Sequence, residues 1–252
     1  MNYFILIIFA LAPSLIWLLF FLKKDAHPES KRMILKIFFY GILIALPAIF
    51  IERALFQGFR ALLIPSVFIF GLNIFIGVAF VEEYLKYLVF KGRVSGSPEL
   101  DEPTDVMIYM IVAALGFAAF ENILIFLPFD SPFLIQEAFF LVLLRFVGAT
   151  FLHALSSGLV GYFLALSFVK ERQRKRLLLM GLGAATILHG LYNLSIIKIG
   201  KGIQGSGSQI KISDPQTFLL FTFILAAILL GLALFVTFGF RKLKKIKSTC
   251  ET

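Results

Sequence analysis

The stretch VEEYLKYL, residues 81–88, places two glutamates and a lysine inside an otherwise apolar part of the chain. A charged side chain at the centre of a lipid bilayer costs about 2.5–3.5 kcal/mol on insertion scales, so such residues usually mark a functional site. Other ionisable groups, Glu121, Arg145, His153 and His189, lie in separate apolar stretches. We therefore expect a polar site inside a bundle of membrane-spanning helices.

The composition is that of an integral membrane protein. Hydrophobic residues make up 60% of the 252 residues, and the mean hydropathy is +0.94, whereas soluble domains are roughly 45–50% apolar. A helix needs about 20 apolar residues to cross a bilayer, and several runs provide them without the alternation that barrel strands show. We predict an all-α, polytopic transmembrane bundle in which residues 1–252 form a single membrane domain.

Seven hydrophobic segments are expected to span the membrane: residues 3–22, 34–51, 62–90, 106–127, 138–169, 177–197 and 217–240. The third and fifth are too long for one upright helix, so each is expected to tilt, break or begin as an interfacial piece. Pro65 is a candidate start in the third. Residues 198–216, rich in Gly and Ser, are predicted to form a flexible connector, which serves either as a simple link or as a lid over the site.

The basic residues predict the topology. Counted over alternate connections, sixteen Lys and Arg residues fall on one side and five on the other. The positive-inside rule places the first set in the cytoplasm, with the N-terminus outside and residues 241–252 as a basic cytoplasmic tail. Because the positive charge gathers at helix ends, we expect the bilayer, and no nucleic acid, as its partner. The single cysteine, Cys250, excludes a disulfide within the chain.

Glu82, Glu83 and Lys86 share a broad helix face at i, i+3 and i+4 spacing. An internal ion pair with Lys86 explains one glutamate and leaves the other without a partner. Two adjacent carboxylates in a low-dielectric site do not both ionise easily, and a carboxylate that exchanges a proton near neutrality can act as a general base.

Three further motifs carry polar groups on separate spans. Glu121 in FAAFEN, residues 117–122, has no basic neighbour within a turn, so its partner must come from another helix, and Arg145 is the candidate. His153 shares a face with Ser157, and the nearby Gly158 and Gly161 would let another helix approach closely.

The last motif is HGLYN, residues 189–193, in which His189 and Asn193 lie one turn apart. An imidazole and an amide together can polarise a carbonyl or bind an oxyanion. The simpler reading of each motif is a hydrogen bond between helices. The ionisable groups spread over about 10 Å along the membrane normal at 1.5 Å per residue, which leaves open whether all of them meet.

Together these four motifs, which cover residues 82–193, resemble the PrsW family of intramembrane proteases, a group related to the CAAX-processing and bacteriocin-processing membrane proteases. The resemblance implies site-1 cleavage of a single-pass membrane protein, typically an anti-sigma factor, at a bacterial cell membrane. At Glu121 the CAAX-type pattern has a histidine, so the CAAX-type mechanism does not transfer directly. The residues that it implies as catalytic are Glu82, Glu83, Glu121, His153, His189 and Asn193, with Lys86, Asn122 and Ser157 in support.

By this resemblance Glu82 or Glu83 is the base that activates water, and Asn193 is an oxyanion donor. Zn²⁺ is a candidate cofactor, for which Glu83, Glu121, His153 and His189 are the candidate ligands. We predict an intramembrane peptidase with its core in residues 62–197. The alternatives are an ion- or proton-coupled transporter, which would use the same intramembrane Glu, His and Lys residues, and a membrane scaffold without catalytic activity.

Overall fold

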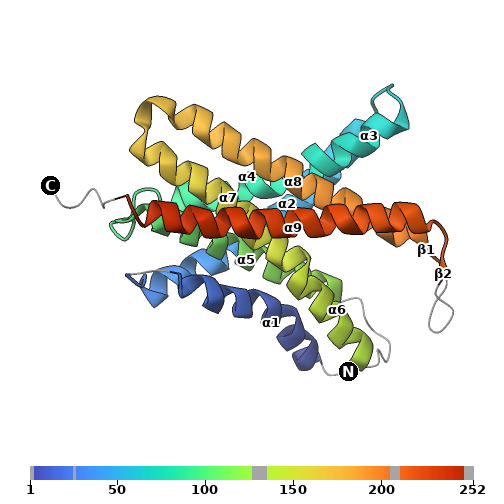
Figure 1. The fold of residues 1–252 in the computed structure, drawn as a ribbon, viewed down its shortest axis with the longest axis horizontal. Helices are drawn as coiled ribbons and strands as arrows, with labels where there is room; N and C mark the ends of the chain where they lie inside the picture. Colours follow the sequence, from blue (N-terminus) through green and yellow to red (C-terminus); the bar gives the residue numbers. More distant parts are fainter. Residues whose placement is uncertain (1–2, 25–26, 127–134, 205–210, 247–252) are drawn as a thin grey trace.

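The computed structural model describes residues 3–24, 27–126, 135–204 and 211–246 and shows a bundle of long helices (Figure 1). Six helices of this described part are long and apolar enough to cross a membrane, and α1 adds a shorter apolar helix, Leu6–Leu22. The helices are α1 (Tyr3–Leu22), α2 (Lys31–Arg60), α3 (Ser66–Leu72), the π-helix η1 (Asn73–Phe80), α4 (Val81–Arg93), α5 (Pro103–Phe126), α6 (Ile135–Val147), α7 (Ala149–Val169), the 3-10 turn η2 (Glu171–Gln173), α8 (Arg174–Gly202) and α9 (Pro215–Leu243). The prediction of an all-α, multi-pass membrane fold is confirmed.

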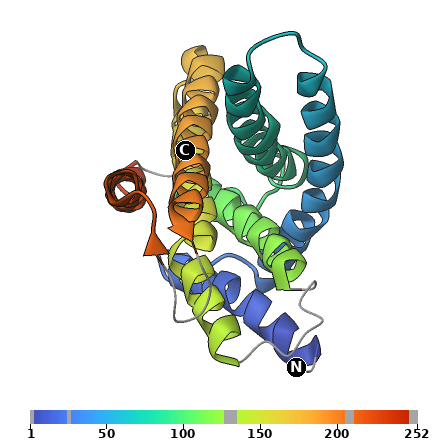
Figure 2. The same ribbon diagram turned by 90° about the vertical axis from the view of Figure 1, so that its right-hand side faces the viewer.

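Helix α5 lies at the centre of the bundle, and α1, α2 and α7 pack around it (Figure 2). Its residues 104–119 are all buried, as expected for a helix that is hydrophobic on every face. Most other spans bury only one side and present large apolar side chains outward, where lipid replaces water. Of the four polar motifs, one lies on α5 itself, two lie on α4 and α7, which contact it, and the last lies on α8, which packs against α7.

Glycines allow the backbones of α2 and α7 to pack closely against α5. A Cβ atom added at Gly116 would lie 2.0 Å from the backbone oxygen of Phe38, and one at Gly41 would lie 2.2 Å from that of Ala113. On another face of α5, a Cβ atom at Gly161 of α7 would lie 2.8 Å from the Cα atom of Met107. The expectation that Gly161 permits close helix packing is confirmed, because small residues let backbones meet inside membranes.

Both overlong segments are irregular: the third is a continuous helix with a π-helical stretch, and the fifth is broken. The third consists of α3, η1 and α4, and it begins after Pro65, which is the N-cap of α3. The π-helical turns end at Phe80, two residues before Glu82, and such irregular turns are frequent at functional sites. The fifth breaks at Gly148 between α6 and α7, where an added Cβ atom would lie 2.6 Å from the hydroxyl of Tyr192.

Several boundaries differ from the predicted ones. Helix α2 continues to Arg60 instead of ending at residue 51, and α8 continues to Gly202. The predicted flexible connector over residues 198–216 is therefore too long, and it also contains an antiparallel pair of short strands, β1 (Ile203–Gln204) and β2 (Lys211–Ile212). Helix α9 extends to Leu243, beyond the predicted end at residue 240. Three parts of the predictions lie outside the described residues: 205–210 of the connector, 127 of the fourth span and 247–252 of the tail.

The predicted topology places alternate connections between spans at opposite ends of the bundle, and the positions of α3, α9 and the two strands agree with it. The C-terminal end of α9 lies at the opposite end of the long axis from α3, β1 and β2 (Figure 1). Which end faces the cytoplasm stays a prediction from the basic residues.

Candidate active site

Four helices bring most of the predicted polar residues into one cluster, which is buried except for the partly exposed Glu121. Helix α4 supplies Glu82, Glu83 and Lys86, α5 supplies Glu121, and α7 and α8 supply the two histidines. Glu83 and Lys86 are 0% exposed, and Glu82 is 4% exposed. Burying charges in this way is costly unless each is paired and hydrogen-bonded, so the contacts of each group indicate its role.

Glu83 is saturated with hydrogen bonds. Its Oε1 atom lies 2.9 Å from each of Lys86 Nζ, Ser156 Oγ and His189 Nδ1. Its Oε2 atom accepts a hydrogen bond of 3.1 Å from Ser157 Oγ. With both oxygens occupied, Glu83 is held rigidly between α4, α7 and α8.

Lys86 is the cation at the centre of the cluster. Its Nζ atom lies 2.9 Å from Glu83 and 3.5 Å from Glu82, so the predicted internal ion pair exists and includes both glutamates. The same atom lies 2.7 Å from Nδ1 of His153 and 4.7 Å from the centre of the Phe117 ring. The second glutamate is therefore not left without a cation, although its contact is the longer one.

Each histidine has a carboxylate at one ring nitrogen. Nε2 of His153 lies 2.8 Å from Glu121, and Nδ1 of His189 lies 2.9 Å from Glu83. Because Lys86 donates to Nδ1 of His153, the network assigns the ring proton to Nε2. The remaining nitrogens, Nδ1 of His153 and Nε2 of His189, lie 3.7 and 3.8 Å from the same Oε2 atom of Glu82.

The cluster is anchored on its α5 side by Arg145. The Arg145 guanidinium contacts Glu121 at 3.2 Å and donates to Oδ1 of Asn122 at 2.6 Å, which confirms the predicted Arg145–Glu121 pair. Asn122 donates in turn to the backbone oxygen of Ala10 at 3.0 Å and to Thr150 Oγ1 at 3.2 Å. These bonds tie α1, α5, α6 and α7 together beside the site.

The donor set fits a catalytic zinc site. Glu82, His153 and His189 each offer one ligand atom, and the three atoms lie within 4.8 Å of one another. Two histidines and one carboxylate form a known catalytic zinc set, and a carboxylate behind each histidine is the usual supporting arrangement. Of the predicted ligands, Glu83 and Glu121 occupy these supporting positions. Lys86 Nζ occupies the lone pair of His153 Nδ1, so a metal ion would have to displace it.

The structure does not bring Asn193 into this network. It is half-buried on α8, one turn after His189, and it makes no hydrogen bond or ion pair with any described residue of the cluster. Sequence reasoning missed Glu52 of α2, which interacts electrostatically with Glu121 and Lys86. It also left out Ser156, which binds Glu83. Glu52 follows the last residue of a predicted span, and only the continuation of α2 to Arg60 places it within the bundle.

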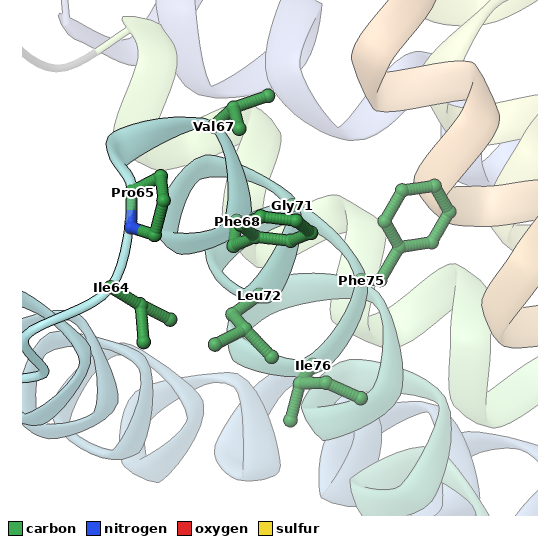
Figure 3. Close-up of a pocket in the computed structure, with 8 residues that line it drawn as sticks. All are labelled: Ile64, Pro65, Val67, Phe68, Gly71, Leu72, Phe75 and Ile76. Atoms are coloured by element: carbon green, nitrogen blue, oxygen red, sulfur yellow. The ribbon is translucent and has the colours of Figure 1, made fainter.

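An apolar hollow of about 610 Å³ lies next to the helix that carries the glutamates (Figure 3). Its lining comes entirely from residues 64–76, which form the end of the connection before α3, α3 itself and the start of η1. The side chain of Phe75 points toward α8, where Gly190 leaves room for it, since an added Cβ atom there would lie 2.3 Å from the Phe75 ring. The hollow is thus on the outer side of α3 and η1, and Phe75 of η1 packs against α8, the helix that carries His189.

The carboxylates and histidines of the four motifs form a cluster between the spans of a multi-pass helical bundle. This combination of fold and site places the chain among the membrane-embedded peptidases. Residues 29–228 match the family described as PrsW family intramembrane metalloprotease. The chain belongs to the PrsW family.

Relatives in several bacteria support this assignment. The chain is 31% identical to Protease PrsW of Oceanobacillus iheyensis over 183 residues, which cover 73% of this chain and 79% of the relative. It is 29% identical to Protease PrsW of Geobacillus kaustophilus, with 69% and 71% covered, and 28% identical to that of Bacillus subtilis, with 77% and 83% covered. No solved structure matches the chain. The chain is accordingly a multi-pass membrane protein of bacterial type.

Proposed function

We propose that the chain cleaves a single-pass membrane protein by site-1 type hydrolysis, with an anti-sigma factor as the typical substrate, and that residues 62–197 carry the site. Family membership supports proteolysis, and the resemblance of the four motifs supports this substrate class. The apolar hollow on α3 and η1 supports a membrane-embedded substrate, because an apolar segment could contact it without leaving lipid. Every relative reported above is named a protease, which favours this function over transport.

The observation that carries the proposal is the difference between the two adjacent glutamates. Glu83 is filled by contacts of 2.9–3.1 Å, whereas Oε2 of Glu82 lies at 3.5–3.8 Å from Lys86 and both histidines. Those longer separations leave Glu82 able to accept one more partner. We assign to Glu82 the activation of the reacting water, either as its general base or as a ligand of the metal ion that would bind it, and to Glu83 the orientation of His189.

The other residues have supporting roles in this proposal. Glu121, held by Arg145, orients His153, and Lys86 balances the negative charge of the buried carboxylates. A zinc ion held by Glu82, His153 and His189 would polarise the scissile carbonyl and lower the pKa of a bound water. Asn193, whose amide has no partner in the cluster, is the proposed donor to the oxyanion, in line with its place one turn after His189.

Cleavage of a co-expressed single-pass reporter tests the proposal. Glu82→Gln should reduce cleavage at least about 100-fold, the lower range for loss of acid–base catalysis, while expression and thermal stability stay close to those of the wild type. Glu83→Gln should also abolish cleavage, because His189 loses its orienting carboxylate. Tyr84→Phe, a change on the same turn at a 40% exposed residue, is the matched control and should cleave normally. Normal cleavage by Glu82→Gln would reject its assignment.

Metal content distinguishes the two chemistries that Glu82 can perform. We expect about one zinc ion per purified chain, as in other two-histidine, one-carboxylate sites, and its loss in His189→Gln but not in Tyr84→Phe. Elemental analysis of the purified protein measures both. A fully active preparation without any metal would assign Glu82 as the general base instead of a ligand.

A further inference from the structure

A second cavity lies on the opposite side of the bundle from the apolar hollow of α3, between α1, the α6–α7 bend and α9. It measures about 470 Å³, within the roughly 300–1,000 Å³ typical of small-molecule sites. Most of its walls are apolar side chains, of which Ile16 and Phe20 are exposed, Phe151 is half-buried, and Leu155, Val236 and Phe240 are buried. None of the polar residues of the candidate active site lines it.

One end of this groove is basic. Lys24 lies just beyond the C-terminus of α1, and Arg241 and Lys244 lie at the C-terminal end of α9. Arg241 and Lys244 are exposed, Lys24 is half-buried, and none of the three forms an ion pair with another residue in the described ranges. This is the end that the positive-inside rule places at the cytoplasmic surface.

The floor of the groove is rigid. The Trp17 ring stacks on Phe151 at 4.1 Å and on Phe146 at 4.9 Å between centroids, and its Nε1 atom donates to the backbone oxygen of Phe146 at 2.8 Å. Phe146 follows Arg145, and Phe151 lies two residues before His153. The floor is therefore formed by the same helix bend that carries Arg145 and His153.

We propose that this groove binds an anionic phospholipid, with the phosphate at Lys24, Arg241 and Lys244 and an acyl chain along the apolar walls. The bilayer supplies such molecules at this depth, and basic pockets between spans on the cytoplasmic side are suited to anionic headgroups. A partner helix fits less well, because an apolar helix would leave three cations unpaired. The proposal is independent of proteolysis, so a failure of either leaves the other standing.

Trp17 provides the test, because it is the only tryptophan in the chain. The full-length protein is placed in phosphatidylcholine vesicles that contain rising fractions of a brominated lipid, whose bromine atoms quench tryptophan fluorescence on contact. Brominated phosphatidylglycerol should reach half-maximal quenching at a fraction at least about fivefold lower than brominated phosphatidylcholine, roughly the effect of a single basic residue near a charged surface. Equal fractions for the two lipids would overturn the proposal.

Two matched triple variants separate a site from general surface charge. Lys24→Gln, Arg241→Gln and Lys244→Gln together should remove the preference for phosphatidylglycerol. Lys23→Gln, Lys242→Gln and Lys245→Gln remove the same charge from exposed neighbours that do not line the groove, and this variant should keep the preference. Equal losses in the two variants would mean diffuse attraction and would contradict a site.

The acyl part of the site is tested separately. Ala233→Leu places a larger side chain in the groove wall and should weaken quenching by phosphatidylglycerol while the helical circular dichroism is unchanged. Soluble glycerol phosphate, added in excess, should not displace the brominated lipid. Displacement by glycerol phosphate, or unchanged quenching in Ala233→Leu, would reduce the site to a phosphate-binding surface and reject the lipid proposal.

Discussion

Glu82 and Glu83 are adjacent in the chain, yet they have different surroundings. A helix turns about 100° per residue, so adjacent side chains face different neighbours. Glu83 faces α7 and α8, where two serines and His189 fill its oxygens, and Glu82 faces the gap between the two histidines. One motif thus supplies an anchoring carboxylate and one that can accept a further partner.

Lys86 is the residue whose removal should affect stability most directly. Lys86→Ala leaves the buried Glu82 and Glu83 without their cation, and breaking such a pair costs about 3–5 kcal/mol. A divalent ion between Glu82 and the histidines would restore positive charge, so added Zn²⁺ should raise the melting temperature of Lys86→Ala more than that of the wild type. Thermal unfolding in detergent, with and without Zn²⁺, measures both effects.

Lys91→Ala is the control for this experiment, because Lys91 is exposed at the end of the same helix. Its melting temperature should stay near that of the wild type and respond to Zn²⁺ in the same way. A response of Lys86→Ala to Zn²⁺ no larger than that of Lys91→Ala would argue against a metal ion in the cluster.

At the scale of the elements, the site depends on how closely α2 and α5 approach. Gly41 and Gly116 face each other, and an added Cβ atom on either would meet backbone of the other helix. This contact, together with the extension of α2 to Arg60, keeps Glu52 within the bundle, where its charge interacts with those of Glu121 and Lys86. Close helix packing and the polar site are thus parts of one arrangement.

Gly116→Ala should destabilise the protein by about 1–3 kcal/mol, the usual cost of overpacking a close-fitting core, because its methyl group would lie 2.0 Å from the Phe38 oxygen. The melting temperature in detergent measures the loss. Gly58→Ala in α2 is the matched change, since an added Cβ atom there meets no atom within 4 Å. It should be neutral or slightly stabilising, as alanine favours helix. Equal stability of the two variants would show that α2 and α5 can separate without cost.

At the scale of the whole molecule, orientation in the membrane decides from which side a substrate and a lipid reach their sites. The excess of Lys and Arg in alternate connections predicts a cytoplasmic C-terminus. The basic end of the α1–α9 groove then faces the leaflet surface that attracts cations in bacteria and other cells.

Thiol labelling of intact cells checks this orientation. Cys250, the single cysteine, should resist a membrane-impermeant maleimide and become reactive only after the cells are opened. In a Cys250→Ser background, Ser213→Cys before α9 should be labelled in intact cells, because Ser213 is exposed at the other end of that helix. Labelling of Cys250 in intact cells would reverse the topology.

The sequence by itself determined the helical membrane fold, the approximate spans, the four motifs and the Arg145–Glu121 pair. These follow from run length, from the high cost of charge in lipid and from the need of Glu121 for a partner beyond its own helix. Pro65 and Gly161 were also predictable, because proline starts helices and small residues permit close packing.

Only the tertiary structure decided which faces meet. Helix α5 is apolar on every side, so hydrophobic periodicity gives it no preferred face. Apart from Lys86 on its own helix, the partners of Glu83 come from residues 70 or more positions away. The inclusion of Glu52 and Ser156, the separation of Asn193 from the network and the groove beside Trp17 depend on such distant contacts. Local sequence patterns do not encode them, because they arise only when helices far apart in the chain pack together.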